Sequence, residues 1–115
     1  MLTVEDVRRV ALGLPQAEET THLRLVSFAV NKKNFAVVQN ELSALALMSE
    51  PEAEQCIAQA PDVYELVTRF DKPIGVRIHL DRASVAQLES AVARAWKCKA
   101  PRKLVVAHET GNRES

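Results

Sequence analysis

The chain has 115 residues, of which 47% are hydrophobic and 26% charged, and its 15 lysine and arginine residues balance 15 aspartate and glutamate residues. This length and composition predict one globular domain that needs no metal or disulfide for stability, and the zero net charge gives no general attraction to nucleic acid. No apolar run approaches the roughly 20 residues that span a bilayer, and the N-terminus is acidic where a secretory signal is basic. We therefore expect a cytoplasmic protein without a membrane partner.

The chain opens with a predicted helix over residues 3–14. Thr3, followed by Asp6 at the third helical position, is typical of a helix start, and Pro15 marks the end. Between them, apolar residues recur at steps of three and four, namely Val4, Val7, Ala11 and Leu14. The polar segment 16–22 that follows is expected to be a surface loop.

Three strands are predicted next, as an antiparallel meander. They cover residues 24–30, 35–39 and 42–48. Turns rich in asparagine separate them, because asparagine tolerates the left-handed backbone of tight turns. A second helix is expected over residues 50–59, where Ser49 and Pro51 are typical of a helix start.

The clearest pattern lies in residues 74–103. After a fourth strand over residues 63–70, apolar and other residues alternate strictly in 74–81, which predicts a strand with one dry and one wet face. Ser84 with Gln87 has the spacing of a capping box, so a third helix is expected over residues 85–98. Its apolar stripe, which faces the sheet, consists of Val85, Leu88, Val92, Ala95 and Trp96.

The predicted order is α-β-β-β-α-β-β-α, which indicates an α+β fold with two layers. A mostly antiparallel sheet of five strands carries the helices on one face. Residues 1–104 form a single domain, and the polar residues 105–115 are expected to be a frayed tail. The predicted core consists of Val4, Val7, Leu14, Phe28, Phe35, Leu45, Ile57, Ile78, Leu88, Val92 and Trp96.

The residues needed for common catalytic and metal sites are not arranged in the usual motifs. The three glycines are too far apart for a phosphate-binding loop, and the two cysteines share no C-x-x-C spacing and have no histidine nearby. The three histidines form no zinc-binding pair. A site assembled from His22, Glu18 and Glu19 stays open beside the simpler interpretation of a solvated loop. We expect no enzyme activity, no cofactor and no metal.

Charge is distributed unevenly along the chain. Residues 41–65 contain six acidic residues and no lysine or arginine, whereas residues 66–103 contain nine basic residues against three acidic ones. Basic residues near a helix C-terminus are also favoured by the helix dipole, and lysines in a turn aid solubility, so structural roles compete with binding. The candidate phosphate-binding residues are Lys32, Lys33, Arg77, Lys97, Lys99, Arg102 and Lys103.

Several short motifs occur in an order that resembles the MmcQ/YjbR-like family of small bacterial proteins. They are Leu14-Pro15, Glu-Glu-Thr-Thr-His at 18–22, Phe-Ala-Val at 28–30, Phe-Ala at 35–36, Gly-Val-Arg-Ile-His-Leu-Asp at 75–81, Ala-Trp at 95–96 and Ala-Pro-Arg-Lys at 100–103. The resemblance covers about residues 3–104. It implies an α-β3-α-β2-α fold that is related to secretion chaperones and compared with a double-wing DNA-binding motif. The family supplies no catalytic residues.

The chain also departs from the family pattern. Many members have a Pro-Gly-Tyr turn before the fourth strand and a tryptophan near the start of the fifth. Here the first region reads Ala-Pro-Asp-Val-Tyr over residues 60–64, and no tryptophan precedes Val76. The surface built by those family residues is therefore expected to differ.

Together, these features predict a small non-catalytic module that binds duplex DNA without sequence preference. Most of the aromatic residues fall on core-facing positions, which argues against a stacking platform for single strands. The alternative is a protein-interaction module, as the chaperone-like fold implies, which uses an exposed sheet face or the acidic residues 41–65. In either case we expect a monomer or a weak dimer.

Overall fold

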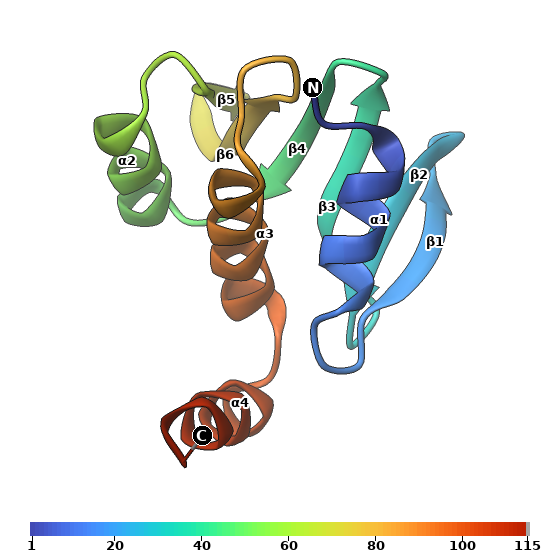
Figure 1. Ribbon diagram of the computed structural model, residues 1–115, viewed down its shortest axis with the longest axis vertical. Coiled ribbons are helices and arrows are strands. Elements are labelled where there is room, and N and C mark those ends of the chain that lie inside the picture. Colours follow the sequence, from blue (N-terminus) through green and yellow to red (C-terminus); the bar gives the residue numbers. More distant parts are fainter. Residues whose placement is uncertain (115) are drawn as a thin grey trace.

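The computed structural model of the protein describes residues 1–114, and the side chains of residues 1–109. Its six-stranded antiparallel sheet has the order β1-β2-β3-β4-β6-β5, and helices cover one of its faces (Figure 1). The helices are α1 (Val4–Leu12), α2 (Glu50–Gln59), α3 (Val85–Lys99) and α4 (Arg102–Glu114). The strands are β1 (Glu18–His22), β2 (Leu25–Val30), β3 (Lys33–Asn40), β4 (Ser43–Leu47), β5 (Tyr64–Arg69) and β6 (Lys72–His79).

The α+β class and the antiparallel sheet are confirmed, but the prediction of five strands is wrong. The segment expected to be a surface loop contains β1, which pairs with β2 from Glu18 opposite Ala29 to His22 opposite Leu25. All its residues are polar, and four of the five are exposed. Polar and charged residues protect an edge strand from pairing with another chain, and they also erase the alternation that reveals a strand.

The prediction of a frayed C-terminal tail is also wrong for the described residues, because the chain continues there as the helix α4. Leu104 and Val105 pack against the core from the first turn of this helix. One turn later, the ring of His108 meets the ring of Trp96 with centroids 5.1 Å apart and planes at 66°. These contacts hold α4 at the end of α3 (Figure 1). Residue 115 of the predicted tail lies outside the described residues.

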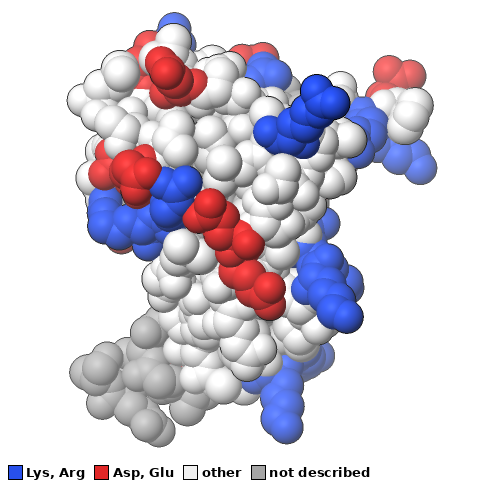
Figure 2. All heavy atoms as spheres, turned by 90° about the vertical axis from the view of Figure 1, so that its right-hand side faces the viewer, with Lys and Arg blue, Asp and Glu red and all other residues white. Residues whose placement is uncertain are grey.

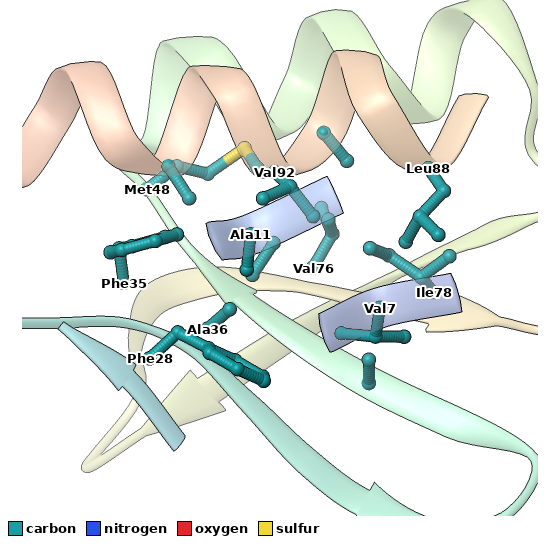
Figure 3. Close-up of a cluster of buried hydrophobic side chains, with 14 of the residues drawn as sticks. Val7, Ala11, Phe28, Phe35, Ala36, Met48, Val76, Ile78, Leu88 and Val92 are labelled. Atoms are coloured by element: carbon teal, nitrogen blue, oxygen red, sulfur yellow. The ribbon is translucent and has the colours of Figure 1, made fainter. Parts of the chain in front are cut away.

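The core lies between the sheet and the helices α1, α2 and α3. Side chains of α1 and α3 point toward those of the strands in Figure 3, and the cluster also includes Ala53 and Cys56 of α2. Of the predicted core residues, Val4, Leu14 and Ile57 are only half-buried at its edge.

Leu45, also predicted as a core residue, is buried at 8% exposure, but it lies outside the main cluster and on the other face of the sheet. It pairs with Val37 on one side and Arg77 on the other, while its chain neighbours Ala44 and Ala46 belong to the core. Side chains of adjacent strand residues point to opposite faces, so Leu45 must face away from the helices. The sheet thus has a second, open face with apolar residues at its centre.

The helix starts follow the expected capping chemistry in two of three cases. Thr3 with Asp6 and Ser84 with Gln87 form complete capping boxes at α1 and α3. Ser49 precedes α2 as expected, but its side chain makes no capping hydrogen bond.

Tyr64 provides a pH-dependent contribution to stability. Its hydroxyl donates to the Gln87 carbonyl at 2.7 Å, and burial raises the pKa of Tyr64 from 10.0 to about 12. The unfolded chain loses this proton near pH 10 and the folded chain retains it, so stability is complete below pH 10 and falls as the pH rises toward 12. The loss should approach about 2–3 kcal/mol.

Tyr64→Phe should remove this alkaline loss. At neutral pH the variant should be less stable by about 1 kcal/mol, because the Gln87 carbonyl loses its donor. Urea unfolding of both proteins at pH 8 and pH 11.5 measures the effect. Equal losses of stability in the two proteins between these pH values would show that Tyr64 is not responsible.

Candidate nucleic-acid interface

A hollow of about 480 Å³ brings together segments that are distant in the sequence. It is lined by His22 of β1 and Asn34 of β3 from one half of the sheet, and by Arg69 of β5 from the opposite edge. Lys99, the last residue of α3, also lines it. The apolar lining residues are Val37, Leu45, Leu47, Met48, Pro73 and Ile74.

Two basic residues without an ion pair line this hollow, and other such residues lie near the lining residues in the chain. Arg69 and Lys99 line it, and Lys33 and Lys72 each precede a lining residue in the chain. Within residues 1–109, no ion pair engages any member of the following set, which we call the basic rim: Lys32, Lys33, Arg69, Lys72, Lys99, Arg102 and Lys103.

The side of the molecule turned away from the helices is rich in exposed basic side chains. Figure 2, a view onto the β1 edge, shows lysine and arginine gathered along its right-hand side, which corresponds to the open face of the sheet. A red band of acidic side chains crosses the middle of the same view. One acidic residue, Asp71, lies in the turn between the rim residues Arg69 and Lys72.

Two predicted phosphate-binding residues are already paired with carboxylates. The Nζ atom of Lys97 lies 3.3 Å from Glu109 Oε1. On the open face, Arg77 Nη1 donates to Glu65 Oε2 at 2.8 Å, and Arg77 Nε donates to Gln39 Oε1 at 3.1 Å. Their charges are therefore partly neutralised, unlike those of the other five predicted residues.

Glu65 is the centre of this open-face network. Its second oxygen, Oε1, lies 3.1 Å from His79 Nε2. The hydrogen bond with His79 and the positive charge of Arg77 lower the pKa of Glu65 below its ordinary value. Arg77 and His79, which the alternation placed on the wet face, thus form a local polar cluster with a carboxylate.

Arg102 and Lys103 lie at the start of a helix and not, as the sequence suggests, just after the end of one. They were expected just after the C-terminus of α3, where the helix dipole favours cations. The structure places them in the first turn of α4, where the same dipole disfavours cations by about 0.3–1 kcal/mol each. The dipole explanation therefore fits Lys97 and Lys99 but does not account for Arg102 and Lys103.

Arg69 and Lys72 belong to the site, although neither is among the candidate residues predicted from the sequence. They are opposite each other in the β5–β6 register, directly beside a two-residue turn. The sequence predicts the hairpin turn at residues 71–73, so the flanking position of both basic residues follows only from the two-residue turn of the structure. What the sequence could not show is that Asn34 and Lys99 lie around the same hollow.

Comparisons of the chain with protein-family models, with curated proteins and with solved structures found no match. Within the described part of the chain, no group of three or more histidine, cysteine, aspartate or glutamate residues is arranged to hold a metal ion. Among the described helices, none combines the length and apolar character needed to cross a membrane.

Proposed function

We propose that the protein is a non-catalytic module that binds duplex DNA without sequence preference, through contacts between the basic rim and phosphates. The observation that carries this proposal is that two basic residues without an ion pair, Arg69 and Lys99, line one hollow from separate segments, while the other rim residues lie near lining residues in the chain. Exposed lysine and arginine side chains gain most from phosphates when no carboxylate already neutralises them. Phosphate contacts fix position but carry little sequence information.

Two further features support the proposal. Arg102 and Lys103 occupy a helix start where cations are unfavourable, and a phosphate ligand would offset that cost. The resemblance to the MmcQ/YjbR-like family, which is compared with a double-wing DNA-binding motif, adds the same expectation. Arg77 and Lys97 would contribute less than the rim residues, because each already has a carboxylate partner.

Replacing Arg102 and Lys103 together with alanine tests the proposal. DNA affinity should fall by a similar factor for unrelated duplex sequences, and the slope of log K against log salt should decrease by roughly two. Gel retardation or fluorescence anisotropy between 50 and 200 mM salt measures both quantities. The fold should persist, because both side chains are exposed.

The matched control replaces Arg8 and Arg9 with alanine. This variant loses the same two charges, but both arginines lie on α1 and pair with carboxylates. It should retain the salt slope of the unmodified protein. Absence of any DNA retardation by the unmodified protein at 50 mM salt, or equal losses in the two variants, would refute binding through the rim.

A protein partner on the open sheet face is the second candidate function. The partly exposed apolar residues that line the hollow, Leu47, Pro73 and Ile74, are the observation that favours it. Salt separates the two candidates, because an apolar protein interface changes little between about 50 and 200 mM salt, whereas phosphate binding weakens steeply. A partner captured equally well at both salt concentrations and after nuclease treatment would favour this function.

A further inference from the structure

The β5–β6 hairpin turn holds a phenylalanine at a positive φ angle. Two residues, Phe70 and Asp71, connect the strands, and their φ angles are 52° and 64°. Positive φ at both positions is the geometry of a type I′ turn, in which asparagine and glycine are strongly preferred. A bulky residue such as phenylalanine is an outlier in this region, because its Cβ crowds the backbone.

The side chain of Phe70 also gains nothing from packing. It is 91% exposed, whereas the other aromatic side chains, Phe28, Phe35, Tyr64 and Trp96, are at most 3% exposed. A buried phenylalanine stabilises a fold by removing apolar area from water, and Phe70 does not do this. Neither the turn geometry nor the core therefore explains why phenylalanine occupies this position.

The charges beside Phe70 indicate what it could contact. Arg69 and Lys72 are opposite each other in the register at the base of the turn, and both belong to the basic rim. Arg69 also lines the hollow. An exposed aromatic ring between two unpaired cations is suited to a ligand that offers both phosphates and flat, apolar rings. Asp71 is exposed in the same turn and leaves the local charge positive.

We infer that Phe70 is an apolar wedge that inserts between base pairs of bound DNA, while Arg69 and Lys72 contact the flanking phosphates. This inference rests on the proposed function and adds a contact with the bases to it. Apolar side chains that enter the duplex partly unstack a base step and kink the helix. Because every base has an apolar face, the contact tolerates any sequence but favours steps that unstack easily.

Phe70→Asn is the decisive substitution, because asparagine suits the turn and lacks the ring. Affinity for a 20-base-pair duplex should fall about tenfold, in the range found when a stacking side chain is removed. The salt slope should not change, since Phe70 neutralises no phosphate. The melting temperature should stay the same or rise, because the turn strain is relieved. Loss of binding with retained or increased stability cannot result from damage to the fold.

Leu23→Asn is the matched control. Leu23 and Arg24 form the β1–β2 turn with φ angles of 52° and 68°, and Leu23 is 77% exposed. The substitution therefore relieves the same kind of strain and removes a similarly exposed apolar side chain. It should leave DNA affinity unchanged, because Leu23 does not lie between two residues of the basic rim.

A duplex that carries 2-aminopurine reports base unstacking directly. Its fluorescence should increase with the unmodified protein and with Leu23→Asn, but not with Phe70→Asn. If the unmodified protein binds the duplex and Phe70→Asn binds it equally well, the wedge is refuted while DNA binding stands. If the unmodified protein does not bind DNA, both proposals fail. Loss of binding to phosphatidylserine vesicles in Phe70→Asn, with DNA affinity unchanged, would assign Phe70 to a membrane surface and overturn the inference.

Discussion

Gly75→Ala is expected to destabilise the protein by about 3 kcal/mol, near the upper end for overpacking a core. A Cβ atom built on Gly75 lies 2.0 Å from the Ala46 carbonyl oxygen and 2.9 Å from Leu47 Cα. Both contacts are with the backbone of the neighbouring strand β4, so no flexible side chain can move away. Strands β4 and β6 would have to separate where Gly75 faces Leu47.

The consequence should extend to the hollow, because Leu47 and Ile74 line it at this position. Gly13→Ala is the matched control. Gly13 has an ordinary φ of −73°, and an added Cβ would lie 3.3 Å from the Arg9 carbonyl, a tight contact that a small shift relieves. Its unfolding free energy should change by less than about 1 kcal/mol. Urea unfolding that gives similar midpoints for both variants would show that the strands tolerate a side chain at Gly75.

Helices and strands could be predicted from the sequence where their apolar residues recur regularly, at every second position in a strand or at steps of three and four in a helix. The strand around Val76 and Ile78 alternates strictly, and α3 carries both a capping box and an apolar stripe. Local signals of this kind suffice because the same residues define the element and its buried face. The strand β1 lacks any such signal, since its five residues are polar and its stability comes from pairing with β2.

The residues of the C-terminal helix contain a signal that was masked by polar neighbours. Leu104, Val105 and His108 are spaced so that they lie on one side of a helix, and this side contacts the core and Trp96. The surrounding residues, which include Gly111 and Asn112, have low helix propensity. Contacts with the core and Trp96 therefore stabilise α4. These contacts cannot be predicted from the sequence until the position of Trp96 in the fold is known.

The candidate site was predictable as a charge imbalance but not as an arrangement. The sequence shows which residues are basic, and it correctly places the Lys32 turn and the wet face of β6. It does not show that Glu65 pairs with Arg77, because these residues are 12 apart and meet only through the β5–β6 register. Nor does it show that Phe70 is exposed in a turn, since the sequence predicts a strand over residues 63–70 and β5 ends at Arg69. Pairing between distant segments determines both outcomes.

Trp96→Ala is expected to cost about 3–5 kcal/mol of stability, the range for removing a large buried aromatic side chain. Trp96 is completely buried, and its indole N–H donates to the Pro15 carbonyl at 3.0 Å. The substitution would leave a cavity between α3 and the end of α1 and would leave that carbonyl without its donor. For a domain with a total stability of about 5–15 kcal/mol, this is a large fraction.

Trp96→Phe separates the ring from the hydrogen bond. It retains an aromatic side chain in the core but cannot donate to Pro15, so it should cost about 1–3 kcal/mol. Denaturant unfolding followed by circular dichroism suits both variants, because Trp96 is the only tryptophan and fluorescence is lost with it. Equal costs for the two variants would assign the whole effect to the hydrogen bond and contradict the cavity argument.

The same residue links the core to the proposed DNA interface. His108 of α4 packs against the Trp96 ring, and α4 carries Arg102 and Lys103 in its first turn. Trp96→Ala should therefore weaken DNA binding under conditions where it stays folded, although no positive charge is removed. Trp96→Phe, which retains a ring for His108, should preserve most of the affinity. If both variants bind DNA like the unmodified protein, the docking of α4 on Trp96 does not position these two cations for phosphate contacts.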